Sequence, residues 1–144
     1  MHARKYSAGF TLLELLVVLV IIGLLAGLVG PRLFSKVDIS KVQTAQTQVK
    51  MMRGALETLR LDIGRFPTSS EGLSLLSEPP RNERLVGKWK GPYLDDAAPP
   101  DPWGQPYQYN VPGANGQPFS LYSFGADGKR GGEGNDADVG LLPP

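Results

Sequence analysis

The sequence has no cysteine, and its single histidine, His2, lies at the extreme N-terminus. Without cysteine, no disulfide holds a loop-rich region together. If the first residues are removed as a leader, no histidine base and no zinc cluster remains in the rest of the chain. These absences argue against the commonest hydrolytic and zinc chemistries.

The chain also lacks an excess of one charge sign: it has 15 Lys and Arg and 14 Asp and Glu, which gives a formal net charge of +1. The basic residues are scattered and are not interleaved with aromatic residues, so we expect no nucleic-acid partner. The length of 144 residues allows one small domain and one extra element. The 18 glycines and 13 prolines predict much loop in the C-terminal part.

One long apolar run is present. Glu14 is the only charged side chain in residues 10–31. As a helix this run would be about 33 Å long, enough for a bilayer core of ~30 Å. Residues 1–9 are basic and contain no acid, as in an export signal whose basic end stays in the cytoplasm. The small-residue junction of Ala8 and Gly9 precedes the apolar run, so we expect the run to be kept and to cross the membrane.

Glu14 lies where a carboxylate is unfavourable, by ~2.5 kcal/mol or more at mid-bilayer and by less near an interface. One interpretation is an interfacial acid at a helix N-terminus, where the helix dipole tolerates it. The other requires a cation, and cleavage after Gly9 would create one: the α-amine of Phe10, one helical turn from Glu14 in its own subunit or in a neighbour. Such a pair fixes the axial register of an assembly, because a slipped subunit leaves both charges unpaired.

Residues 5–14, followed by the apolar helix, resemble the class III signal of type IV pilins and type II secretion pseudopilins. The resemblance implies that a prepilin peptidase cleaves between Gly9 and Phe10 and N-methylates Phe10, and that Glu14 acts in assembly. It divides the chain into a cleaved leader (residues 1–9), a transmembrane and assembly helix (10–31) and a periplasmic domain (32–144).

Beyond Pro31, where we expect a kink or a locally melted segment, apolar residues recur at alternating steps of three and four. They are Val42, Ala45, Val49, Met52, Leu56, Leu59 and Ile63. This spacing predicts an amphipathic helix of roughly 25 residues, ended by Gly64 and Pro67. We favour packing of its apolar stripe on the chain's own C-terminal domain over a coiled-coil seam.

The remaining chain predicts a short helix at residues 70–76 and two strands, 107–111 and 119–123, joined by a turn and able to pair as a hairpin. No periodicity continues beyond Gly125. We therefore expect an α+β fold in which a long N-terminal helix packs on a small antiparallel β-sheet of about three strands, followed by an ordered terminal loop.

Residues 124–138 combine four acids with five glycines. Calcium requires six to eight hard oxygen ligands on a backbone free to curl, although the spacing here is not that of an EF-hand. A solvated acidic turn is the alternative. The missing cysteines favour the metal, because ordering a glycine-rich loop is entropically unfavourable and no disulfide does it.

Five segments are similar to the major pseudopilin family of the type II secretion system: the N-terminal motif and residues 66–73, 101–107, 123–128 and 131–138. The resemblance implies a type IV pilin-like fold with a structural calcium ion in the final loop. By position, Asp127 and the carbonyl of Phe124 match family ligands. Gly134 stands where members often carry another acid, so that Asp136 or Asp138 must substitute or the site is weaker.

The function so implied is structural and not enzymatic: a helical homopolymer, the periplasmic pseudopilus, which drives export of folded proteins across the outer membrane. The implied partners are further copies of the chain, minor pseudopilins, the prepilin peptidase and the inner-membrane assembly platform. The implied location is the inner membrane, crossed once, with the C-terminal domain in the periplasm.

Two alternatives remain open. A true type IV pilin of an adhesive or DNA-uptake fibre shares the N-terminal motif, but such pilins usually close their C-terminal loop with a cysteine pair. A membrane-tethered periplasmic hydrolase could use acid pairs such as Asp95 with Asp96 or Asp136 with Asp138, as glycosidases do. These pairs lie in turn-like sequence without a pocket-forming pattern around them.

Overall fold

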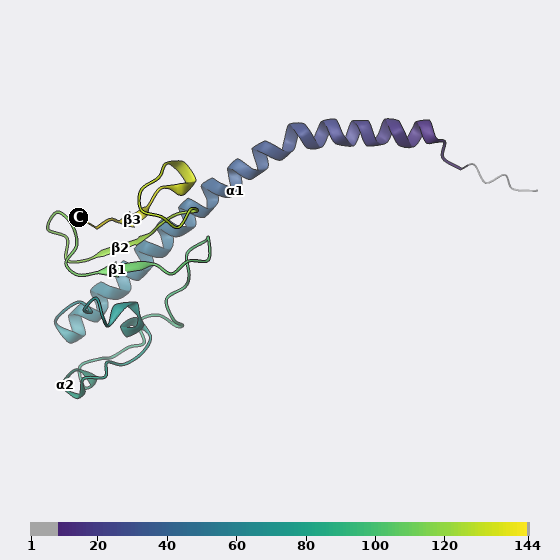
Figure 1. Ribbon diagram of the computed structural model, residues 1–144. Coiled ribbons are helices and arrows are strands. Elements are labelled where there is room, and N and C mark those ends of the chain that lie inside the picture. Colours follow the sequence, from purple (N-terminus) through teal and green to yellow (C-terminus); the bar gives the residue numbers. More distant parts are fainter. Residues whose placement is uncertain (1–8, 144) are drawn as a thin grey trace, which may run out of the picture. The chain divides into compact units, whose positions relative to one another are not determined.

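The computed structural model describes residues 9–143, and at residues 32–35 the backbone alone. The elements along the chain are α1 (Leu12–Ile63), η1 (Gly72–Leu76), α2 (Glu83–Val86), β1 (Gln108–Asn110), β2 (Ser120–Ser123), η2 (Gly134–Asp136) and β3 (Val139–Leu141) (Figure 1). The chain divides into two compact units, Met1–Val37 and Asp38–Pro144. This division falls within α1, a few residues beyond the predicted boundary at 31/32.

Helix α1 contains both the apolar run and the amphipathic segment. The sequence predicted a kink or a locally melted segment near Pro31. The helix continues through Pro31, so the melted alternative is not found: proline removes one donor, and the backbone on either side stays helical. The helix ends as predicted at Gly64, which adopts a φ of 90° that other residues rarely take. The Gly64 amide donates to the Arg60 carbonyl oxygen at 2.7 Å and closes the last turn.

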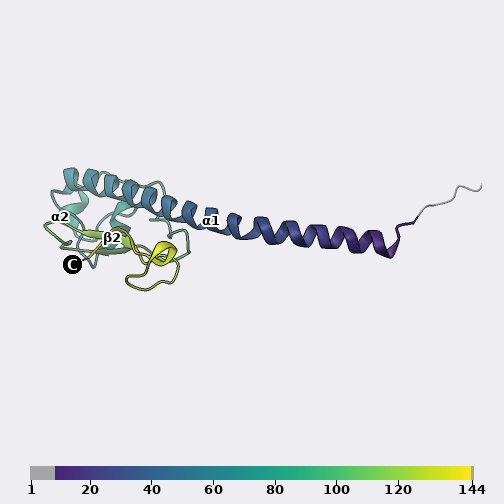
Figure 2. The same cartoon turned by 90° about the horizontal axis from the view of Figure 1, so that it is seen from above.

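The predicted apolar stripe forms one side of the core of the second unit. Six of its members are at most 5% exposed: Ala45, Val49, Met52, Leu56, Leu59 and Ile63. Against the stripe pack residues of η1 and of the sheet region, namely Leu75, Leu76, Tyr107, Tyr109, Phe119 and Leu121. The sheet lies along this part of α1 (Figure 2), which confirms packing on the chain's own domain.

The sheet has three antiparallel strands in the order β1-β2-β3. Tyr109 of β1 is opposite Leu121 of β2, which in turn is opposite Leu141 of β3. The hairpin predicted from residues 107–123 is confirmed. Strand β3 lies in the stretch for which the sequence predicted only an ordered loop, because three residues with a central glycine show no alternation.

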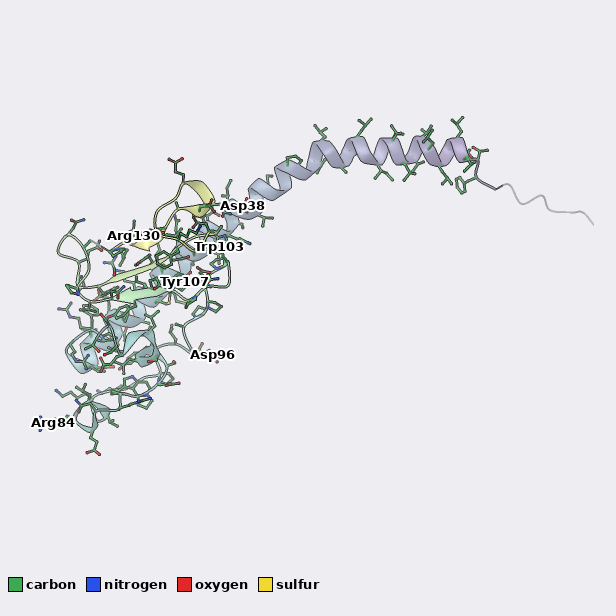
Figure 3. All side chains as sticks on the ribbon, viewed as in Figure 1. Asp38, Arg84, Asp96, Trp103, Tyr107 and Arg130 are labelled. Carbon is green, nitrogen blue, oxygen red and sulfur yellow. The ribbon has the colours of Figure 1, made fainter. Side chains whose placement is uncertain are left out.

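Tyrosine hydroxyls fasten the remaining chain to α1. Tyr93 donates to Asp62 Oδ2 at 2.8 Å, and Tyr107, labelled in Figure 3, donates to Gln48 Oε1 at 2.6 Å. Both acceptors lie on α1. Burial raises the pKa of Tyr107, so its hydroxyl remains a donor at every physiological pH. The long segment between η1 and β1 is thereby held on the helix at two separate points.

Candidate functional site

The N-terminus of α1 is a reciprocal capping box. Glu14 Oε2 accepts hydrogen bonds from the Thr11 backbone amide at 2.7 Å and from the Thr11 hydroxyl at 3.0 Å. In return, the Glu14 amide donates to Thr11 Oγ1 at 3.2 Å. Two first-turn donors are thus satisfied within the subunit. Both hydrogen bonds that the Glu14 carboxylate accepts go to Oε2. Among the described residues, no donor is bonded to Oε1, which is therefore able to accept one.

Thr11 was missed in the sequence. The signal was available, because a threonine followed three residues later by a glutamate immediately before an apolar run is typical of a helix start. Gly9 and Phe10 lie outside the helix, and Phe10 is 84% exposed. The predicted cleavage and methylation site therefore directly precedes the capped end of α1 and is exposed within the described structure. The roles of Gly9, Phe10 and Glu14 stay predictions.

The first half of α1 leaves its apolar side chains uncovered. Leu12, Leu19 and Leu24 are 88%, 67% and 71% exposed, and apolar side chains project on all sides of this segment (Figure 3). By length and composition, α1 is able to cross a membrane. Apolar surface of this extent needs lipid or neighbouring helices as a partner.

The acidic loop of residues 124–138 connects β2 to β3. Asp127 is exposed, and its Oδ1 accepts the Lys129 amide at 3.0 Å. Asp136 is exposed at the end of η2. Asp138 is half-buried, and its Oδ2 accepts the Gly131 amide at 3.0 Å. The Phe124 ring packs edge-on against Tyr122, with ring centroids 5.3 Å apart.

These acids do not form one carboxylate cluster: no group of three acidic, histidine or cysteine side chains in the described part of the chain is arranged to hold a metal ion. Two other oxygens stand out. Asn135 Oδ1 and Asp138 Oδ1 are buried acceptors that have no hydrogen-bond partner among residues 9–143. An unpaired buried acceptor is costly, and a cation relieves that cost.

The donor set of the loop fits a hard cation. It offers a carboxylate oxygen and an amide oxygen, both buried, on a backbone that curls through several glycines. Asn135 was missed in the sequence, although side-chain amide oxygens are ordinary calcium ligands. The ligand set predicted from the sequence (Phe124, Asp127, Asp136 and Asp138) stays a prediction, to which the geometry adds Asn135.

A capped helix with an uncovered apolar first half, followed by a small antiparallel sheet, is the architecture of a pilin-like subunit. Two families match the chain. "Prokaryotic N-terminal methylation motif" matches residues 4–30, and "Type II secretion system (T2SS), protein G" matches residues 32–142. The two matches meet near the end of the apolar run.

Individual relatives belong to the same family as the match to residues 32–142. The chain is 46% identical to the "Type II secretion system core protein G" of Pseudomonas aeruginosa, with 95% of this chain and 96% of the relative covered. The chain is 39% identical to the "Type II secretion system core protein G" of Vibrio cholerae, with 97% of this chain and 94% of the relative covered. A crystal structure of the major pseudopilin from the type 2 secretion system of enterohaemorrhagic Escherichia coli superposes with a TM-score of 0.61 at 29% identity, over 76% of this chain and 93% of that one.

The chain therefore belongs to the protein G family of the type II secretion system, the major pseudopilins. The pseudopilus subunit role predicted from the sequence agrees with this family, whereas neither alternative, the adhesive pilin or the tethered hydrolase, gains support. The family is structural and is not known for catalysis.

Proposed function

We propose that the mature chain begins at Phe10, crosses the inner membrane once and polymerises through its apolar helix into the periplasmic pseudopilus that drives export of folded proteins. The role is structural and involves no catalysis. The observation that carries the proposal is the uncovered apolar surface on every side of the first half of α1. Lipid covers that surface while the subunit is in the membrane before assembly, and neighbouring helices cover it in the filament.

Further contacts are part of the proposal. The prepilin peptidase cuts after Gly9 and methylates the new amine, minor pseudopilins begin the filament, and the inner-membrane assembly platform adds subunits. The exposure of Phe10 and the start of α1 at Leu12 support access by the peptidase. Mass spectrometry of membrane-extracted protein tests this step, since a chain that keeps Met1 in cells with active peptidase would contradict it.

The absence of cysteine allows a direct test of polymerisation. We would place cysteines at Leu16 and Leu28, on the uncovered part of α1, and oxidise membranes of cells that contain the secretion machinery. Head-to-tail neighbours should give a ladder of multimers, because each subunit then carries two linkable positions.

Each single-cysteine variant is the matched control and should stop at dimers. The double variant in cells without the secretion ATPase should give no ladder. A double variant that stays monomeric in intact cells, or that forms the same ladder without the ATPase, would show that the chain does not assemble in this way.

We also propose that the loop of residues 124–138 binds calcium through oxygens drawn from the Phe124 carbonyl, Asp127, Asn135, Asp136 and Asp138. The ion would supply a positive centre that offsets the negative charge of these oxygens. The two buried, unpaired acceptors on Asn135 and Asp138 support this assignment. In a chain without disulfides, such an ion would join the two arms of the loop.

A further inference from the structure

A buried carboxylate lies outside the loop. Asp101 is 3% exposed and begins a tight turn before β1 that contains Trp103, labelled in Figure 3. Its Oδ1 accepts the backbone amides of Trp103 at 3.0 Å and Gln105 at 2.8 Å, and its own amide donates to the Gln105 carbonyl oxygen at 2.8 Å. The position and orientation of this carboxylate are therefore fixed by its own turn.

The other carboxylate oxygen reaches the last residue of β2. The hydroxyl of Ser123, which is fully buried, donates to Asp101 Oδ2, and the same Oγ accepts the Gly125 amide at 3.0 Å. A hydroxyl has one proton and an ionised carboxylate can only accept. The Asp101 charge thus fixes the direction of the Ser123 hydroxyl and turns its lone pairs towards Gly125.

Gly125 is the point at which the two arms of the loop meet. It has a φ of 73°, and a Cβ there would come within 2.6 Å of the Ala137 carbonyl oxygen and 3.0 Å of that of Asn135. The next amide, of Ala126, donates to the Asn135 carbonyl oxygen at 2.9 Å. The backbone conformation at Gly125 therefore determines how the returning arm, with Asn135 and Asp138, lies against the outgoing one.

We propose that Asp101 is a positioning residue for the cation loop, acting through Ser123 on Gly125. The hydrogen bonds run without a gap from the turn before β1, through the end of β2, to the junction of the two loop arms. This inference rests on the calcium proposal for its ligand, but the preorganisation it describes is a property of the metal-free chain as well.

Asp101→Asn tests the chain of bonds with little change of shape. The oxygen of the new amide must remain towards the amides of Trp103 and Gln105, so its NH₂ group faces Ser123. The Ser123 hydroxyl then accepts from that group, and its own proton has no acceptor in a fully buried place. Because that proton must turn towards another group, the lone pairs of Oγ turn with it and the bond from the Gly125 amide is weakened. Ser123→Ala removes the same link from the other side.

The matched control is Asp62→Asn. Asp62 also accepts a side-chain hydroxyl bond, from Tyr93, but fastens a different segment of the chain. All variants are studied as the full mature chain in detergent. Two readouts are taken: calcium affinity by calorimetry, and hydrogen exchange of the Gly125 and Ala126 amides in the presence of chelator.

We expect Asp101→Asn and Ser123→Ala to weaken calcium binding about tenfold, as the loss of one charge-assisted hydrogen bond would. Both should also speed exchange at Gly125 and Ala126 without metal. Asp62→Asn should lower the melting temperature but leave both readouts as in wild type.

Equal calcium affinity and equal exchange in wild type and Asp101→Asn would overturn the positioning role and leave the calcium proposal standing. The same loss in Asp62→Asn as in Asp101→Asn would also overturn it, because the effect would then be general destabilisation. If wild type binds no calcium, the calcium proposal fails by itself, and exchange at Gly125 and Ala126 in chelator still decides the positioning role.

Discussion

Glu14 makes local bonds that do not depend on its charge alone, so its two candidate roles can be separated. A glutamine at the same position of a capping box still accepts from Thr11, whereas alanine does not. A neutral amide, however, cannot pair with the ammonium group of a neighbouring subunit.

We therefore expect both Glu14→Gln and Glu14→Ala to insert in the membrane and neither to assemble. The cysteine ladder and the amount of secreted protein measure assembly, and membrane fractionation measures insertion. Wild-type assembly by Glu14→Gln would mean that the residue serves only to cap α1.

A second glutamate, Glu71, is held by local hydrogen bonds in the turn between α1 and η1. Glu71 Oε2 accepts the Thr68 amide at 2.8 Å, and Arg65 binds both carboxylate oxygens of Glu71, at 2.7 and 2.9 Å. The hydrogen bonds from Arg65 are the largest cause that lowers the pKa of Glu71 to about 2. The Glu71 side chain is 27% exposed, so solvent screens part of the interaction.

Because the folded pKa of Glu71 is depressed, its contribution to stability is present above the unfolded value of 4.5 and is lost as the pH falls towards about 2. Glu71→Gln should therefore lower the free energy of unfolding by on the order of 1 kcal/mol at pH 7 and by almost nothing near pH 2. Urea titrations of the detergent-solubilised chain at several pH values measure this. Glu78→Gln, at a nearby exposed glutamate, is the matched control.

At the scale of elements, α1 presents two contrasting surfaces. Its second half gives one stripe to the core of its own unit, and Leu56 in that stripe is fully buried, whereas Leu61 is 85% exposed. The stability of the second unit should thus depend on the stripe and be indifferent to the outer face.

Leu56→Ala should lower the free energy of unfolding by about 2–5 kcal/mol, through lost burial and the cavity left behind. Leu61→Ala, the same substitution on the same helix, should change it by less than about 0.5 kcal/mol. Denaturant unfolding followed by circular dichroism compares them. Equal effects would mean that the stripe is not the core.

Long periodic elements were predictable from the sequence, and short or locally bonded ones were not. The three-and-four spacing from Val42 to Ile63 reflects burial of one helix face, which fixes residue type strongly. Strand β3 and the four-residue α2 are too short to impose a period, and β3 is held by register with β2. Asn135 carries no signal of its own, because only folding of the loop buries its oxygen.

At the scale of the whole molecule, calcium should act on the global stability of the second unit, since no disulfide performs that task. A ligand of the folded state at a hundredfold excess over Kd adds about 2.7 kcal/mol, a shift on the order of 10 °C for a domain of this size. We expect chelator to lower the melting temperature of the full chain accordingly. Magnesium should rescue poorly, because it prefers strict octahedral geometry and sheds water reluctantly.

Asp138→Ala should melt like wild type in chelator and gain nothing from added calcium. Glu133→Ala, an exposed acid of the same loop whose side chain does not cap η2, should respond to calcium as wild type does. If wild type melts at the same temperature with calcium and with chelator, the calcium proposal is wrong and the loop is a solvated acidic turn.

The order of the strands has a consequence for biogenesis. β2 is the central strand, yet β3, one of its two neighbours, follows every other element along the chain. During synthesis the β1–β2 hairpin is available first, and a two-stranded hairpin alone is marginal in water. A chain in which residues 139–141 have not yet paired with β2 is therefore not a finished, protease-resistant domain, so the subunit stays open to proteolysis until that strand is in place.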